Sequence, residues 1–145
     1  MFKKFLVPTD GSTQSAKAVQ GAIQLAGQVG GSLVALAVVE PYPFPAISES
    51  PYAGGSAAYE ERALDLAKDH VEQVAAAAAK AGIPCETVVL HGLYPHEEIV
   101  AAALGRSCDA ILMGTHGRRG ISRLFAGSET QSVIGQSPIP VMVFR

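Results

Sequence analysis

The sequence has few cysteines, little net charge and no long apolar run. Cys85 and Cys108 are far apart and form no CxxC pair, so the pattern indicates neither a disulfide framework nor a zinc site. Thirteen acidic against eleven basic residues give a formal net charge of −2, which is not the balance of a general nucleic-acid or membrane binder. The longest apolar runs, LVALAVV and VAAAAA, are too short to span a bilayer. We expect a soluble, cytoplasmic protein in a reducing compartment.

The sequence also lacks the familiar signatures of catalysis, metal binding and secretion. It contains no GxSxG elbow, no Walker GxxxxGK(S/T) loop and no GxGxxG fingerprint. Its histidines, His70, His91, His96 and His116, show no metal-ligand spacing such as HxxxH. The N-terminal apolar run is short and Asp10 follows soon after it, unlike a secretory signal. We therefore predict no catalytic residue, no metal-ligand cluster and no signal peptide.

What the sequence does contain is a regular alternation of apolar and helical segments. Strands are expected at residues 5–8, 32–40, 85–92, 109–114 and 139–145, with helices at 13–29, 57–81, 95–107 and 128–137 between them. The segment at 32–40 is continuously apolar, as expected for a strand that helices cover on both faces. The alternation predicts one α/β domain over residues 1–145, with a parallel sheet and right-handed crossovers.

Two of the expected helices have a clear inner face, and one connection is unusual. The inner face of the first helix is predicted to contain Ala16, Val19, Ile23, Leu25 and Ala26. The inner face of the second helix is predicted to contain Leu64, Ala67, Val71, Val74 and Ala78. The connection at 41–56 is rich in proline, glycine and serine and is long for a small domain. It is either a lid or binding loop, or a surface excursion without a role.

Glycines gather between the fourth strand and the fourth helix. Gly114 and Gly117 allow the close approach of a ligand and a positive φ, and Gly127 and Ser128 begin the last helix. The first N–H groups of that helix lack internal partners and carry the positive end of its dipole, so they can bind a phosphate. Arginines that can neutralise further phosphate charge are Arg118, Arg119 and Arg123. Each feature has a simpler explanation when taken singly: the glycines can form a tight turn, Ser128 can cap the helix, and the arginines can be solvated. Their joint arrangement favours a phosphate site.

This arrangement resembles the G-2x-G-9x-G-(S/T) signature of the ATP-binding branch of the universal stress protein family. The likeness extends along the whole chain, through FLVPTDGS, LVALAVVE, GLYPHEEIV, CDAILMGTHGR and SPIPVMVFR. It implies a Rossmann-like, doubly wound five-stranded parallel sheet in the order 3-2-1-4-5, with helices on both faces. Strands one and four then flank the switch point at which ligands of such sheets bind.

The resemblance also implies a set of ATP-contacting residues. Carried over by position, they are Pro8, Thr9, Asp10, Val38, Met113, Gly114, Gly117, Arg118, Gly127, Ser128, Glu129 and Thr130. Asp10 is expected to reach the nucleoside or a bound Mg²⁺, the Val38 backbone to read the adenine edge, and residues from Gly117 onward to hold the phosphates. Glu129 departs from the family's usual small or apolar residue, and its carboxylate would repel a triphosphate. We expect its side chain to serve as a first-turn acidic residue and its N–H to be the ligand.

Three functions remain open for these residues. The first is an ATP-binding stress protein that stores or senses the nucleotide with slow or no hydrolysis. The second is a weak ATPase or nucleotidyl-transfer enzyme, and the third is a nucleotide-free protein-interaction module. The intact glycine pattern argues against the third, and the lack of a convincing general base argues against the second. Asp10 as a phosphoacceptor is a weak alternative, because the third strand ends in His91 and Gly92 and not in an aspartate.

The last strand predicts a homodimer. In the order 3-2-1-4-5 the strand from Pro140 to Arg145 is a sheet edge, and only these two residues blunt its apolar VMVF segment. An uncovered apolar edge invites pairing with a second copy about a twofold axis, which the resemblance also implies. The alternative is an edge that the protein's own helices shield.

Overall fold

The strands and helices occur in the predicted order in the computed structural model, which describes residues 1–42, 55–115 and 128–145. The strands are β1 (Lys4–Pro8), β2 (Ser32–Val39), β3 (Cys85–His91), β4 (Ala110–Gly114) and β5 (Val141–Phe144). The helices are α1 (Thr13–Val29), α2 (Gly55–Lys80), α3 (Pro95–Gly105) and α4 (Ser128–Gln136). Most of the connection at 41–56 lies outside the described residues, so its role stays a prediction.

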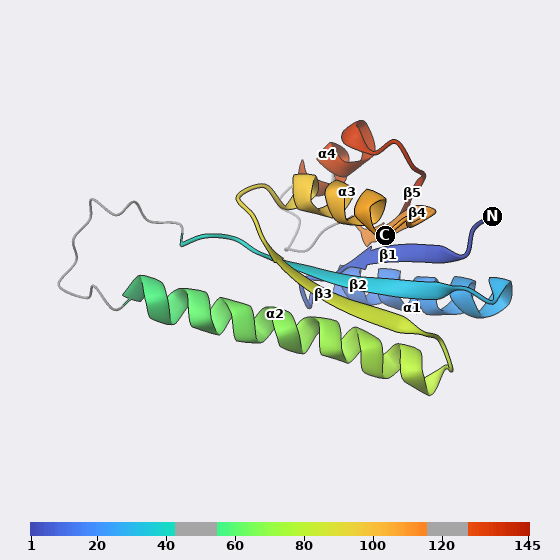
Figure 1. Cartoon of the computed structure of the whole chain (residues 1–145), viewed down its shortest axis with the longest axis horizontal. Helices are drawn as coiled ribbons and strands as arrows, with labels where there is room; N and C mark the ends of the chain where they lie inside the picture. Colours follow the sequence, from blue (N-terminus) through green and yellow to red (C-terminus); the bar gives the residue numbers. More distant parts are fainter. Residues whose placement is uncertain (43–54, 116–127) are drawn as a thin grey trace.

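All five strands are parallel and form one sheet in the order β3-β2-β1-β4-β5, which confirms the predicted topology (Figure 1). β2 and β3 lie on one side of β1, whereas β4 and β5, which follow later in the chain, lie on its other side. This reversal creates a switch point between β1 and β4. In open α/β sheets, ligands bind beyond the carboxyl ends of the strands at such a point.

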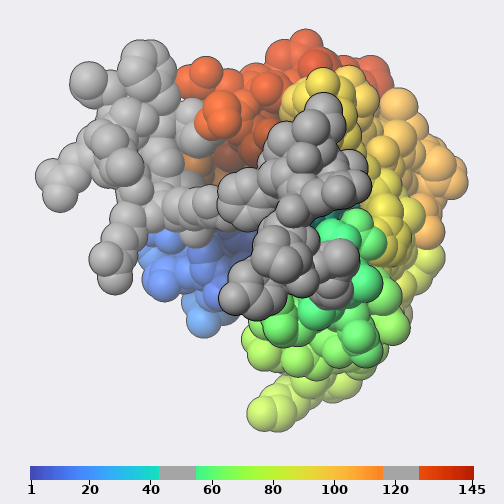
Figure 2. All heavy atoms as spheres, turned by 90° about the vertical axis from the view of Figure 1, so that its left-hand side faces the viewer, coloured from blue at the N-terminus to red at the C-terminus, as the bar shows by residue number. Residues whose placement is uncertain are grey.

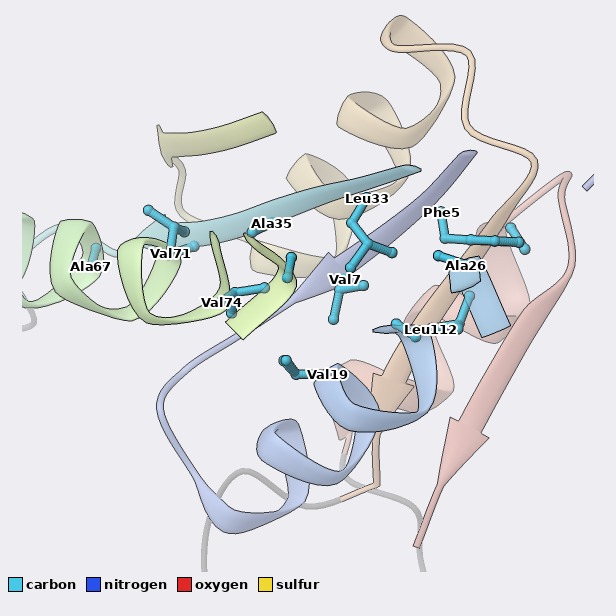
Figure 3. Packing of buried hydrophobic residues seen from close by; sticks show 14 of the residues in the cluster. Phe5, Val7, Val19, Ala26, Leu33, Ala35, Ala67, Val71, Val74 and Leu112 are labelled. Carbon is cyan, nitrogen blue, oxygen red and sulfur yellow. The ribbon is translucent and has the colours of Figure 1, made fainter. Parts of the chain in front are cut away.

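Two helices cover each face of the sheet, α1 and α2 on one side and α3 and α4 on the other (Figure 1). In β1, Phe5 and Val7 belong to the cluster under α1 and α2, whereas Leu6 belongs to the cluster under α3 and α4. Side chains alternate along a strand in this way, and all three residues are at most 1% exposed. Figure 3 shows the first cluster, in which side chains of α1 and α2 meet those of β1, β2 and β4.

The inner face of α1 differs from the prediction. Its buried residues are Ser15, Ala18, Val19, Ala22 and Ala26. The prediction is therefore correct at Val19 and Ala26 and wrong at Ala16, which is exposed, and the other two predicted residues are only partly buried. Small side chains face the sheet because α1 lies close to it. At Gly21, for example, the Phe144 ring of β5 leaves no room for a Cβ.

The inner face predicted for α2 is confirmed. Its buried residues are Ala67, Val71, Val74 and Ala78, and the fifth predicted residue, Leu64, packs partly buried against the same cluster. After α2 the chain turns at Gly82, which has φ +73° and so adopts the left-handed conformation that commonly follows a helix. In the described part of the chain, no helix combines the length and apolar character needed to cross a membrane.

Candidate functional site

The strands run toward the left in Figure 1, so their carboxyl ends lie on the side of the molecule that faces the viewer in Figure 2. The loop between β1 and α1 is fixed at this edge by its own hydrogen bonds. The Thr9 N–H donates to the Leu36 carbonyl at 2.8 Å, the Gly11 N–H to the Thr9 hydroxyl at 3.2 Å, and the Ser12 N–H to Asp10 Oδ1 at 2.9 Å. The Ser12 side chain then caps α1. These bonds hold Asp10 exposed beside the switch point.

β2 extends further than β1 at this edge. The pairing of β1 with β2 ends at Pro8 and Leu36, whereas β2 continues to Val39 and stays paired with β3. The Leu36 carbonyl accepts the Thr9 N–H, so it points toward β1. Because the direction of backbone groups repeats every two residues, the N–H and C=O of Val38 point the same way, beyond the end of β1. Val38 thus presents a donor and an acceptor to the switch point.

The loop after β1 is also contacted from α2. Gly11 has φ +77°, and the His70 ring lies against it and leaves no room for a Cβ. Either feature alone favours glycine at this position. His70 is one of the four histidines that looked scattered in the sequence. The signal that could have placed it is its helical position, three residues after Ala67 and one before Val71 on the buried side of α2.

Gly114 ends β4 on the other side of the switch point. A Cβ at Gly114 would lie 2.5 Å from the Gln14 carbonyl oxygen and 3.0 Å from the Gln14 Cβ, so the first turn of α1 occupies the space of the missing side chain. The positive φ predicted for Gly114 is wrong, because the residue continues the β4 ladder opposite Phe144. The preceding residue, Met113, is buried in the cluster under α3 and α4.

The first turn of α4 is tied to the end of β4. Thr130 is 3% exposed, and its hydroxyl donates to the Gly114 carbonyl at 3.0 Å. That hydroxyl is therefore engaged inside the protein, while Ser128 and Glu129 are exposed. The predicted phosphate contacts of all three residues stay predictions. The remaining predicted phosphate ligands, Gly117, Arg118 and Gly127, lie outside the described residues.

The Glu129 carboxylate is bonded to a different helix, α3. Its Oε2 accepts the His96 N–H at 2.8 Å and lies 3.1 Å from His96 Nδ1. Tyr94, the N-cap of α3, makes no side-chain capping bond, so Glu129 satisfies a first-turn N–H of α3 in its place. In Figure 2 the yellow start of α3 and the orange start of α4 lie side by side. Sequence reasoning missed this pair because 33 residues separate its members and no local pattern links them.

A pocket of about 280 Å³ opens at the carboxyl ends of β2 and β3. Its lining residues are Val39, Glu40, Pro41, Glu60, His91, Gly92 and Leu93. The pocket lies on the α2 side of β2, because Val39 packs there whereas Val38 packs on the opposite face. Among the residues that the structure describes, no three His, Cys, Asp or Glu side chains are grouped so that they could hold a metal ion.

Comparison with known proteins gives a match along the whole chain. The model of the universal stress protein family matches residues 1–145. A universal stress protein of Thermus aquaticus is 35% identical over 146 residues, covering 100% of both chains. Another, from Methanocaldococcus jannaschii, is 32% identical over 145 residues, covering 100% of this chain and 83% of the relative. The solved structure of UspA from Lactobacillus plantarum aligns with a TM-score of 0.84 at 26% identity, over 99% of this chain and 98% of that chain.

Two further solved structures are complexes with adenine nucleotides. A universal stress protein in complex with cAMP aligns with a TM-score of 0.71 at 23% identity, over 99% of this chain and 97% of that chain. A universal stress protein of Archaeoglobus fulgidus in complex with dAMP aligns with a TM-score of 0.71 at 19% identity, over 100% of both chains. At these identities the likeness shows a shared fold, and the nucleotides are properties of those proteins.

Proposed function

We propose that this chain, which belongs to the universal stress protein family, binds ATP across the switch point between β1 and β4. The observation that carries the proposal is the backbone edge of Val38, which points toward the switch point beyond the end of β1. On the other side of β1, the exposed first turn of α4 is tied to β4 through Thr130. This order of groups suits an elongated ligand with a planar base at one end and phosphates at the other.

Val38 offers the base a hydrogen-bond donor and an acceptor from one residue. Adenine carries an acceptor, N1, beside a donor, the N6 amino group, and one N–H with one C=O on the same side of a strand complements these two atoms. Pro8 and Thr9 at the end of β1 and Met113 at the end of β4 border this position. Guanine carries an acceptor where adenine has its amino group, so we expect GTP to bind more weakly.

Asp10 and the start of α4 supply the polar contacts for the rest of the nucleotide. The exposed Asp10 carboxylate can accept hydrogen bonds from ribose hydroxyls, or share a Mg²⁺ whose other ligands are phosphate oxygens and water. The N–H groups of Ser128 and Glu129 are first-turn donors of α4, where backbone N–H groups and the helix dipole favour a phosphate. By resemblance, Gly117, Arg118 and Gly127 complete the phosphate contacts.

We propose that the protein stores or senses the nucleotide in a stress response, with slow or no hydrolysis. Hydrolysis requires an oriented water and a group that stabilises the charge developing in line with it. Asp10, the carboxylate of the loop after β1, already accepts the Ser12 N–H, which suits a positioning contact better than proton abstraction from water. A weak ATPase is the alternative that the test below separates.

We also propose a homodimer through β5. This strand is an edge of the sheet, and Met142 on it is 47% exposed. Phe144 packs over Gly21 of α1, and this contact holds β5 in place so that a second strand can pair with it. Pairing with β5 of a second copy about a twofold axis would satisfy the edge backbone and cover Met142.

Mass spectrometry of nucleotide released from the denatured protein, with calorimetric titration of the nucleotide-free protein, tests the ATP site. Released ATP, and GTP affinity about tenfold or more below that of ATP, would support it. Asp10→Ala should weaken ATP binding, and Asp65→Ala on the exposed side of α2 is the matched control. No binding of ATP, or equal binding of ATP and GTP, would contradict the proposal, and released ADP or AMP would favour the enzyme. Gly114 is a poor choice for this test because a side chain there displaces α1.

A further inference from the structure

Glu129 creates an electrostatic conflict at the proposed phosphate site. It lies in the first turn of α4, whose N–H groups attract anions through their unpaired hydrogens and the helix dipole. A carboxylate beside these groups would compete with a phosphate for the same donors and would repel its charge. In the structure the carboxylate is bonded to His96 on α3 instead.

His96 is well suited to hold the carboxylate in this position. The backbone N–H of His96, at 2.8 Å, and its ring Nδ1, at 3.1 Å, contact the same oxygen of Glu129. A proton on Nδ1 makes the ring a second donor whether the imidazole is neutral or charged. The His96 side chain is 16% exposed against 48% for Glu129, and the Tyr94 ring lies 5.9 Å from the imidazole. His96 is therefore the fixed member of the pair.

Without the His96 ring, the backbone N–H of residue 96 is the one group on the first turn of α3, within the described residues, that still donates to the Glu129 carboxylate. The charged neighbours on the first turn of α3 are Glu97 and Glu98, which are carboxylates and cannot donate to it. The first-turn N–H groups of α4 itself are the donors that an acidic residue near a helix N-terminus commonly uses. Those are the groups that we assign to the phosphates.

We propose that His96 is a positioning residue that holds the Glu129 carboxylate on α3 and thereby sets the preference of the site for a triphosphate over a monophosphate. This role rests on the proposed ATP site. Repulsion from a misplaced carboxylate increases with the charge of the phosphate chain, so losing the His96 contact should weaken ATP most, ADP less and AMP least.

Two substitutions of Glu129 separate this role from a structural one. Glu129→Asp keeps the charge but is one methylene shorter, so the carboxylate no longer reaches His96 and stays near its own helix turn. We expect the Kd for ATP to rise about fivefold, with the Kd for AMP changed by less than about twofold. Glu129→Gln removes the charge and keeps an oxygen that accepts the His96 N–H, so its affinity for ATP should equal or exceed that of the wild type. Glu97→Asp, the same change one residue beyond His96, is the matched control and should alter neither value.

His96→Ala provides the second test, by calorimetric titration of ATP, ADP and AMP into each nucleotide-free variant. It removes the Nδ1 contact and leaves the backbone N–H, so the Glu129 carboxylate is held less firmly and ATP binding should weaken selectively. Adding Glu129→Gln in the same chain should restore the affinity. Melting temperatures of all variants identify any that fail to fold. We expect Glu129→Asp to fold, because aspartate is itself favourable in the first turn of a helix. Equal weakening of all three nucleotides, or Glu129→Gln weaker for ATP than Glu129→Asp, would overturn the role of His96. The role of His96 is also overturned if the wild type and the variants bind ATP equally well. If the wild type binds no nucleotide, the ATP site itself is overturned.

Discussion

The glycine at the end of β4 is required by the packing of α1, and replacing it tests this reading directly. In Gly114→Ala the new Cβ would lie 2.5 Å from the Gln14 carbonyl oxygen and 2.6 Å from the Gln14 carbonyl carbon. Both are backbone atoms in the first turn of α1, which the Ser12 cap holds in place. They cannot rotate away as a side chain would, so α1 or β4 must move.

The expected destabilisation follows from this overlap. Forcing an extra methyl group into a packed position costs about 1–3 kcal/mol. In a domain of about this size, each kcal/mol lowers the melting temperature by about 3–4 °C, so we expect a decrease of about 3–12 °C. Gly135→Ala on α4 is the matched control, because a Cβ there meets no atom of the described residues within 4 Å. Alanine in a helix is favoured over glycine by about 0.5–1 kcal/mol, so this control should be slightly more stable than the wild type.

Thermal and urea unfolding of nucleotide-free protein, followed by circular dichroism, measures both changes. Nucleotide must be removed first, because a bound ligand raises the melting temperature by itself. The opposite signs of the two glycine-to-alanine changes are the expected result. A Gly114→Ala variant as stable as the wild type would refute the close approach of α1, and it would leave a ligand as the reason for glycine at this position.

Three further predictions concern the thiols, one carboxylate and the edge strand. Burial raises the pKa of the Cys85 and Cys108 thiols, so at pH 8 a thiol reagent should label both more slowly in the native protein than in urea, and equal rates would contradict this. Two backbone N–H groups at the start of β1 lower the pKa of Asp109, so its stabilising contribution is complete above the ordinary aspartate range and is lost as pH falls through the lowered pKa. The stability difference between wild type and Asp109→Ala should therefore shrink on acidification, and a constant difference would refute the cause. Deleting residues 141–145 should yield monomer or aggregate in light scattering, whereas a clean dimer would exclude β5 as the interface.

The sequence by itself determined the element order and, with the family resemblance, the sheet topology. Continuous apolar runs at β1 and β2 indicate strands covered on both faces, and the period of α2 correctly predicts Ala67, Val71 and Val74 as buried. These features depend on local periodicity, which a single chain segment carries. The positions of Asp10, Val38 and Gly114 at the carboxyl edge follow from the same order, because parallel strands end together.

Only the tertiary structure decided which distant groups meet at that edge. The buried residues of α1 are smaller than the sequence pattern predicts, because the helix packs closely enough for Gln14 to contact Gly114. The pairing of Glu129 with His96 joins residues on separate helices, and the contact of a histidine of α2 with the loop after β1 likewise joins segments far apart in the sequence. Such contacts depend on how helices and strands are placed in three dimensions, and the spacing of residues within a segment carries no information about that placement.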